Sequence, residues 1–231
     1  MSTVDVDGLG MYYEWHGEPD AEPLVLILGL SLDVSEVGSL IEGLAVRYRV
    51  LAFDNRGAGR TDKPDAPYTI EQMAADTAGL MRAVGLPRAQ VLGISLGGRI
   101  ALALALAEPA MVERLILVST GARVVRSLRR RLMLALAARR PRPPRGYPQP
   151  RYAFRRQLDA STAYDATARL AEIRAPALIL HGIRDRSMPL ALAEELHAGL
   201  AGSVLRTFPG GHAFMFAGGR RQFLEAVTGE S

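Results

Sequence analysis

The sequence GISLG at residues 93–97 places one serine, Ser95, between two glycines. This GxSxG pattern follows a short apolar run that is typical of a strand, and it precedes a long apolar helical pattern. A strand, a sharp turn and a helix in this order expose a serine hydroxyl above the edge of a sheet, because the glycines let strand and helix approach closely. The pattern is weak by itself, but its context makes Ser95 a candidate nucleophile.

A serine hydroxyl needs a neighbouring base that accepts its proton, and histidine is the usual base. His212 lies in PGGHAFMF, directly after the last predicted strand, where a loop could approach Ser95. His16, His181 and His197 fall in an amino-terminal hairpin, at a strand end and in a surface helix. We expect structural roles for these three, so His212 is the candidate base.

The base needs an acceptor on its other ring nitrogen, which fixes the tautomer and stabilises the imidazolium. Asp185, in HGIRDRSMP, follows the strand predicted at 176–181. The position after the preceding strand is an alternative for the acid, but residues 119–122 read STGA and offer none. Asp185 is therefore the candidate acid, and capping of the following helix is its alternative role.

The elements that must position these residues alternate along the chain. Short apolar runs at 24–28, 49–54, 89–94, 112–119, 176–181 and 204–208 predict strands, and helical patterns occur at 70–84, 96–107, 153–173, 189–200 and 217–227. Continuously apolar strands are covered on both faces, and their alternation with helices indicates a mostly parallel sheet. The segment VDVDGLGMYYEWHG predicts an antiparallel hairpin that turns at Asp7 and Gly8. The predicted fold class is α/β.

Five segments occur together in an order that resembles the α/β-hydrolase superfamily, in its esterase and lactonase branch: LVLILGLSLD, FDNRGAGRTDKP, GISLGG, HGIRDRSMP and GGHAFMF. The resemblance covers nearly the whole chain. Within that branch, the sequence is similar to 3-oxoadipate enol-lactonases. It implies an α/β-hydrolase fold with a mostly parallel eight-stranded sheet flanked by helices. It also implies a catalytic triad of Ser95, Asp185 and His212, in the family's chain order.

The resemblance further implies a short helical cap inserted after the sixth strand. We expect the hydrolase core at 1–122 and 175–231, and an arginine-rich cap at 123–174. Residues 123–156 hold twelve arginines and no acid, whereas the rest carries 16 basic and 24 acidic residues, a formal net charge of −8. An apolar helix face ringed by arginines fits a cap that packs over the site, and recognition of an acidic substrate or anionic interface is the alternative.

An oxyanion hole is also implied by the resemblance, and backbone N–H groups can provide it. Leu96 follows the nucleophile at the start of a helix, where its N–H is free and the helix dipole favours an anion. Leu30, in the loop after the strand at 24–28, is the expected second donor. Leu28 stands where relatives often have histidine, so this loop departs from the family's pattern.

The sequence also suggests roles for the loop at 54–61 and for three apolar side chains. The loop DNRGAGRT at 54–61 is expected to be structural, with Arg56 pairing with nearby acids or carbonyls. Met133, Phe154 and Phe214 are candidate walls of the substrate pocket, and each is equally compatible with a place in the core.

The composition excludes several kinds of chemistry. The 231 residues include no cysteine, so thiolate nucleophiles, disulfides and thiolate metal sites are excluded. The histidine spacing fits no metal site and no phosphate-binding glycine motif occurs, so we expect neither metal nor cofactor.

Aromatic residues are sparse and the remainder of the chain is acidic, which argues against a nucleic-acid partner. No signal sequence and no apolar run of roughly 20 residues is visible, so we expect a cytoplasmic protein without a membrane span.

These observations predict a serine hydrolase that cleaves carboxylic esters or lactones of small molecules through an acyl-enzyme. One alternative is a C–C bond hydrolase or enol-lactonase of aromatic catabolism, in which cap arginines hold a substrate carboxylate. Cofactor-free formation of peroxyacids by the same residues is a lesser alternative. A noncatalytic receptor or signalling protein is the alternative from another class, because a fold does not by itself determine a function.

Overall fold

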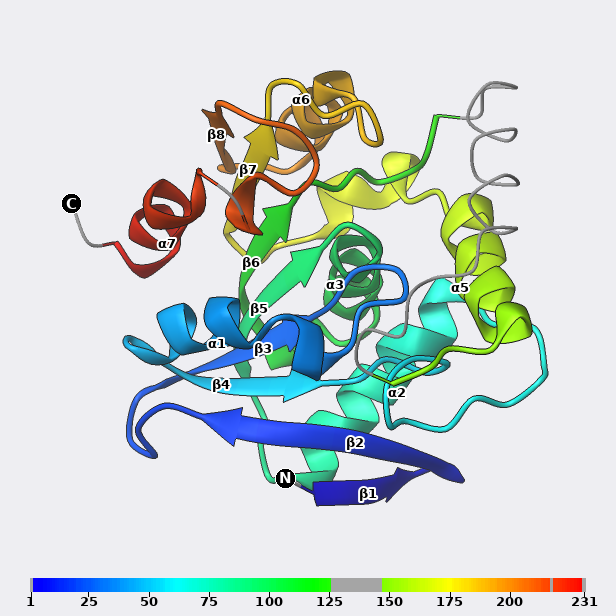
Figure 1. Cartoon of the computed structure of the whole chain (residues 1–231). Helices are drawn as coiled ribbons and strands as arrows, with labels where there is room; N and C mark the ends of the chain where they lie inside the picture. The colour runs from blue at the N-terminus through cyan, green and yellow to red at the C-terminus, as the bar shows by residue number, and fades with distance from the viewer. Residues whose placement is uncertain (1, 126–146, 217, 230–231) are drawn as a thin grey trace.

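A computed structural model describes residues 2–125, 147–216 and 218–229 (Figure 1). Its centre is an eight-stranded sheet with the strand order β1-β2-β4-β3-β5-β6-β7-β8. The strands are β1 (Ser2–Val6), β2 (Leu9–His16), β3 (Glu22–Ile27), β4 (Tyr48–Phe53), β5 (Ala89–Ile94), β6 (Val112–Val118), β7 (Ala177–Gly182) and β8 (Val204–Phe208). The pairs β1–β2 and β2–β4 are antiparallel and all other pairs are parallel, which confirms the predicted sheet.

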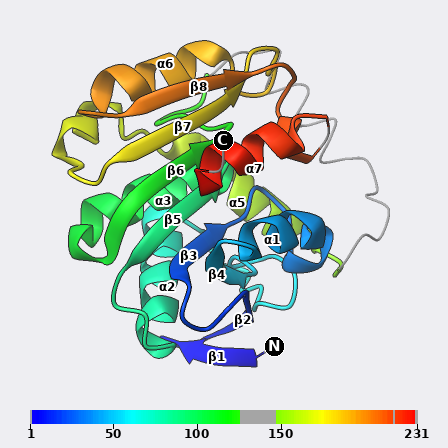
Figure 2. The same ribbon diagram turned by 90° about the vertical axis from the view of Figure 1, so that its left-hand side faces the viewer.

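Helices cover both faces of this sheet (Figures 1 and 2). One face carries α2 (Ile70–Ala83), α3 (Leu96–Ala107) and α6 (Leu190–Gly199), and the other carries α1 (Gly38–Ala45) and α7 (Arg220–Thr228). Alternate residues of each central strand enter opposite cores: Val25 and Ile27 pack on the first face, and Leu24 and Leu26 on the second. The strands are therefore apolar on both faces, as their continuous hydrophobicity predicts. Short 3-10 helices occur at η1 (Val34–Glu36), η2 (Pro109–Met111), η3 (Thr167–Glu172) and η4 (Phe214–Phe216).

The amino-terminal hairpin forms where the sequence predicts it. Asp7 and Gly8 connect β1 to β2 and have φ values of 51° and 81°. A tight hairpin turn of this type requires positive φ at both central residues, and aspartate and glycine tolerate it best. The hairpin forms the edge of the sheet beside β4.

Two features differ from the sequence prediction. No helix is predicted at α1, because Gly38 and Gly43 are weak helix formers. Packing overrides that preference: a Cβ at Gly43 would lie 2.5 Å from Leu224 Cδ1 on α7, so the glycine permits close contact between the two helices. The single helical piece expected at 153–173 is instead two elements, α5 (Arg151–Ala163) and η3, separated by extended backbone at Tyr164.

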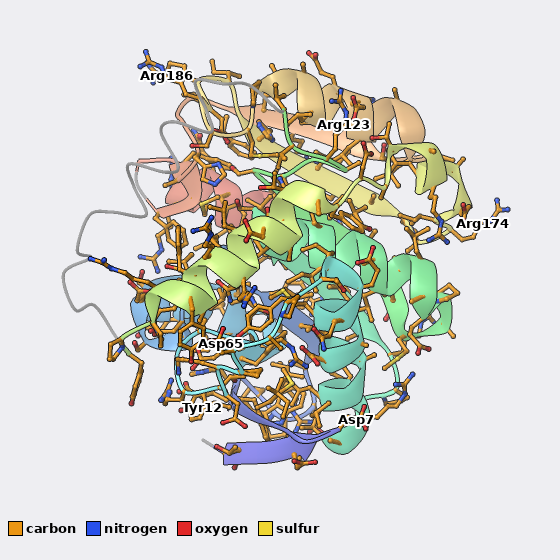
Figure 3. The ribbon with its side chains drawn as sticks, turned by 90° about the vertical axis from the view of Figure 1, so that its right-hand side faces the viewer. Asp7, Tyr12, Asp65, Arg123, Arg174 and Arg186 are labelled. Atoms are coloured by element: carbon orange, nitrogen blue, oxygen red, sulfur yellow. The ribbon has the colours of Figure 1, made fainter. Side chains whose placement is uncertain are left out.

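The connection between β6 and β7 contains α5 and η3 in its described part. Helix α5 lies beside α2 and over the loop after β4, where Asp65 is found (Figure 3). Three side chains of this segment anchor it to that loop: Gln149 donates to the carbonyl of Gly57 (2.8 Å), Tyr152 donates to the carbonyl of Lys63 (2.7 Å), and Arg156 pairs with Asp65 (3.2 Å). The cap boundaries of 123–174 stay a prediction.

The loop after β4 is itself fixed to α2 by an ion pair. Arg56 donates from Nε and a terminal nitrogen to the two carboxylate oxygens of Asp76, at 2.7 and 2.6 Å. Both side chains are nearly buried, at 12% and 9% exposure. Burial raises the pKa of Asp76, and the guanidinium of Arg56 opposes that rise. The structural role predicted for Arg56 is confirmed.

Replacing Arg56 should leave a buried carboxylate without its partner. Arg56→Met is expected to lower the free energy of unfolding by about 3 kcal/mol at pH 7. The loss should shrink at pH 5, because an acid whose pKa is raised by burial takes up a proton more readily in the folded state than in the unfolded state. Urea denaturation at both pH values measures this. Arg82→Met, which breaks an exposed pair with Glu108, is the control and should cost less than about 1 kcal/mol. An equal loss for both variants would contradict the prediction.

Candidate active site

Ser95 occupies a tight turn between the end of β5 and the start of α3. Its backbone has φ 55° and ψ −108°, a region that residues with side chains rarely adopt. The N–H of Ser95 donates to the carbonyl of Val118 (2.9 Å), and the hydroxyl of Thr120 donates to the carbonyl of Ser95 (2.7 Å). Val118 ends β6 and Thr120 follows it closely, so the neighbouring strand holds the strained turn.

The two glycines of the motif meet close backbone contacts. A Cβ at Gly97 would lie 2.1 Å from the carbonyl oxygen of Ile27, and a Cβ at Gly93 would lie 2.4 Å from the carbonyl oxygen of Gly97. Neither gap admits a side chain unless the backbone moves, so glycine is required at both positions. The glycines therefore let α3 begin close to β3 and β5, as the motif predicts.

The structure brings Ser95, His212 and Asp185 together. Nε2 of His212 lies 3.0 Å from Oγ of Ser95, and Nδ1 of His212 lies 2.7 Å from Oδ2 of Asp185. The three residues follow β5, β8 and β7, whose carboxyl ends meet at one edge of the sheet. A proton on Nδ1 bonds to Asp185 and leaves the lone pair of Nε2 facing the serine hydroxyl. This arrangement can remove a proton from Ser95.

Asp185 is buried and its negative charge is supported by several donors. Its side chain has no exposed area, whereas the side chain of His212 is 34% exposed. The N–H groups of Ser187 (2.8 Å) and Met188 (2.9 Å) donate to Oδ1. Burial alone would raise the pKa of Asp185, but the hydrogen bonds from His212 and the two N–H groups outweigh burial and hold the pKa below its ordinary value. A carboxylate is therefore present at neutral pH and can stabilise an imidazolium at His212.

The other three histidines bond to groups other than Ser95, and one of them, His181, lies near the acid, with Nε2 3.7 Å from Oδ2 of Asp185. Nε2 of His181, which is fully buried, lies 2.8 Å from the carbonyl oxygen of Met188, and burial lowers the pKa of His181. His181 is therefore neutral and donates from Nε2. His16 and His197 bond to side chains two and six residues away. These contacts agree with the structural roles expected for them.

The backbone groups expected to form an oxyanion hole lie on elements beside Ser95. Leu96 is the first residue of α3, and the first N–H groups of a helix have no intrahelical partner. Leu30 lies in the loop after β3, and a Cβ at the neighbouring Gly29 would be 3.6 Å from the Cβ of Ser95. That loop therefore borders the nucleophile. The role of Leu30 and Leu96 as donors stays a prediction.

The candidate pocket walls have different surroundings. Met133 lies outside the described residues. Phe154 is half-buried on α5. Phe214, two residues after His212, is 3% exposed, and its ring stacks on that of Phe208 with centroids 4.7 Å apart. This packing places Phe214 in the core, and a pocket role for these residues stays a prediction.

Three further residues support the site, and the sequence does not assign any of them this contact. Thr120 fixes the carbonyl of Ser95, and the side-chain amide of Asn55 donates to the carbonyl of Leu28 at the start of the loop that carries Leu30 (3.0 Å). Gln157 of α5 accepts a hydrogen bond from the backbone of that same loop (3.1 Å). These contacts join residues 25, 27 and 126 positions apart in the sequence, so no local pattern could reveal them.

The described part of the chain shows neither a cluster of metal ligands nor a membrane-spanning helix. Within it, no three histidine, aspartate or glutamate side chains gather as metal ligands would. None of its helices is both long enough and apolar enough to cross a membrane.

Comparison with known proteins shows the family to which the chain belongs. A family model described as the alpha/beta hydrolase fold matches residues 16–162. The candidate carbamate hydrolase RutD of Variovorax paradoxus is 32% identical over 88% of this chain and 89% of that protein.

Two solved structures are similar over almost their whole length. A hydrolase from Pseudomonas aeruginosa PA01 has a TM-score of 0.88 and 26% identity, covering 99% of this chain and 97% of that one. The enol-lactonase from Burkholderia xenovorans LB400 has a TM-score of 0.86 and 25% identity, covering 99% and 98%. With the eight-stranded sheet and the family match, these likenesses establish that the chain belongs to the α/β-hydrolase fold family and is a hydrolase.

Proposed function

We propose that the protein is a serine hydrolase that cleaves carboxylic esters or lactones of small molecules through an acyl-enzyme. The observation that carries the proposal is the position of His212, with Nε2 at 3.0 Å from Oγ of Ser95 and Nδ1 at 2.7 Å from the buried carboxylate of Asp185. A base in contact with both a nucleophile and an orienting acid is the arrangement that acyl transfer needs.

In the proposed acylation step, Nε2 of His212 accepts the proton of Ser95 as Oγ attacks the carbonyl carbon of the substrate. Asp185 keeps the ring oriented and stabilises the imidazolium, and its pKa, lowered by hydrogen bonds, keeps it anionic during this step. The tetrahedral intermediate collapses when the C–O bond to the alcohol breaks. The alcohol leaves with the proton that His212 held.

Water then attacks the acyl-enzyme with the same groups in reversed order. His212 accepts a proton from water, and the hydroxide adds to the acyl carbon. The bond to Ser95 breaks, the proton returns from Nε2 to Oγ, and the carboxylic acid leaves. In both halves the substrate oxygen becomes negative, and the N–H groups of Leu30 and Leu96 are the donors proposed to bind it.

Two other substrate classes are candidates for the same residues. The similarity to RutD, a candidate carbamate hydrolase, favours carbamates, whose carbonyl carbon is attacked in the same way. The similarity to an enol-lactonase, together with the twelve arginines at 123–156, favours a lactone that carries a carboxylate. A noncatalytic binding protein is disfavoured, because a binding role requires no aligned nucleophile, base and acid.

Ser95→Ala should abolish hydrolysis without unfolding the protein, because the change removes only the nucleophilic oxygen. The expected loss in kcat on p-nitrophenyl butyrate is about ten-thousand-fold or more. Ser39→Ala, at an exposed serine on α1, is the matched control and should keep the parental rate. Circular dichroism should be unchanged for both. Parental turnover by folded Ser95→Ala would refute the proposed nucleophile.

Asp185→Asn should lower kcat by about 10³- to 10⁴-fold, because an amide cannot stabilise the imidazolium or enforce the tautomer that presents a lone pair to Ser95. The matched control is Asp20→Asn, an exposed aspartate in the turn before β3, at the opposite edge of the sheet. Steady-state kinetics on the same ester measure both. A folded Asp185→Asn variant within about tenfold of the parent would mean that this acid does not orient the base.

A substrate panel separates the candidate classes. We expect kcat/KM for neutral esters and lactones to be at least about tenfold higher than for carbamates of equal size. Electron donation from nitrogen makes the carbamate carbonyl less electrophilic, so the site would have to stabilise the transition state for a carbamate more strongly to reach the same rate. A lactone that carries a carboxylate and reacts far faster than its neutral analogue would instead support the enol-lactonase alternative. Preference for carbamates would support a function like that named for RutD. Tight binding without turnover of any member would support the noncatalytic alternative.

A further inference from the structure

Gln157 is a fully buried polar side chain in the middle of α5. Its Oε1 accepts hydrogen bonds from the backbone N–H of Ser31 (3.1 Å) and from the side-chain amide of Gln149 (3.1 Å), and its Nε2 donates to the carbonyl of Arg56 (2.8 Å). Because Ser31 can only donate here and Arg56 can only accept, the orientation of the amide is fixed. One side chain thus joins α5 to the loops after β3 and β4.

The loop after β3 needs such support. Ser31 has φ 64°, in the left-handed region, and it is not a glycine. A residue keeps this conformation only when its surroundings fix it. Within the loop, the N–H of Leu32 donates to the carbonyl of Gly29 (3.2 Å), and Gln157 supplies the contact to Ser31 from a distant part of the chain.

The hydrogen bond between Gln157 and Ser31 restricts the backbone next to Leu30. The N–H of Leu30 and the N–H of Ser31 belong to consecutive peptide units that meet at the Cα of Leu30. When Gln157 fixes the second unit, the backbone has less freedom to rotate the first unit, whose N–H is the proposed oxyanion donor. The neighbouring Gly29 borders Ser95, so a small rotation here changes the geometry beside the nucleophile.

Attachment of α5 does not depend on Gln157 alone. Tyr152 and Arg156 hold the same segment to the loop after β4 through contacts that do not involve Gln157. Each of those contacts ends on residues 57–65, whereas the Oε1 of Gln157 bonds to the loop that carries Leu30. Removing Gln157 and removing another anchor should therefore have different effects on the reaction.

We propose that Gln157 is a positioning residue for the oxyanion hole: its Oε1 holds the Ser31 amide, and this aims the N–H of Leu30 at the carbonyl oxygen that becomes negative. The inference rests on the proposed function, because it concerns the oxyanion of that reaction. It assigns to the chain between β6 and β7 a direct effect on the rate of acyl transfer.

Gln157→Met tests the proposal, since methionine has a similar volume and bonds to neither loop. The expected result is a fall in kcat on p-nitrophenyl butyrate of about 10- to 100-fold with KM changed by less than about threefold, because a misaimed donor affects mainly the transition state. Inhibition by phenylboronic acid, whose tetrahedral serine adduct places an oxygen in the hole, should weaken by a similar factor.

The control is Tyr152→Phe, which removes the hydrogen bond from the same helix to the carbonyl of Lys63 and leaves every hydrogen bond of Gln157 in place. It should lower the thermal midpoint, while kcat and boronate inhibition stay within about threefold of the parent. If Gln157→Met does not fold, Gln157→Asn keeps an amide that is too short to span both loops, and it should show the same kinetic pattern.

Two results would overturn the proposal for Gln157. One is a folded Gln157 variant with parental kcat and parental boronate inhibition. The other is an equal loss of kcat in the Gln157 and Tyr152 variants that follows their loss of thermal stability, which would show a purely structural role. Failure of the proposed function is seen separately, as ester turnover that survives Ser95→Ala.

Discussion

The close approach of α3 to the ends of β3 and β5 is the constraint on which the active-site edge depends. Gly97 lies so near Ile27 that even one methyl group would force the helix outward, and Gly93 is confined in the same way by Gly97. Ser95 sits between them in a strained conformation that β6 holds through Val118. An outward shift would lengthen the 3.0 Å contact to His212 and would move the start of α3 with it.

The active site also depends on the electrostatic environment of Asp185. A buried carboxylate is costly unless donors surround it, and Asp185 meets this condition with two backbone N–H groups and the ring of His212. The same hydrogen bonds that stabilise its charge hold the imidazole in place. His212 is partly exposed, so a substrate can approach its other side while its acid partner stays shielded from water. The acid is thus buried and the base is partly exposed, although their side chains are in direct contact.

Local sequence patterns predict the parts of this molecule that depend on near neighbours. Apolar runs predict all six parallel strands, and the glycines around Ser95 predict the turn, because both signals lie within a few residues. Helix α1 is not predicted, because one of its glycines, Gly43, is explained only by its contact with Leu224, far along the chain. The roles of Thr120 and Gln157 are not predicted for the same reason, because both side chains act through hydrogen bonds to distant backbone atoms. Phe214 stacks on Phe208, six residues earlier, and the sequence leaves open whether such an aromatic side chain lies in the core or at a pocket.

Covalent labelling of the nucleophile tests the central claim most directly. A fluorophosphonate reacts with a serine only when a base removes its proton, so the parent protein should acquire one adduct, located at Ser95 by peptide mass spectrometry. The labelling should be nearly abolished in His212→Ala, which removes the base. Labelling at another residue, or a labelling rate at Ser95 that His212→Ala leaves unchanged, would contradict the account.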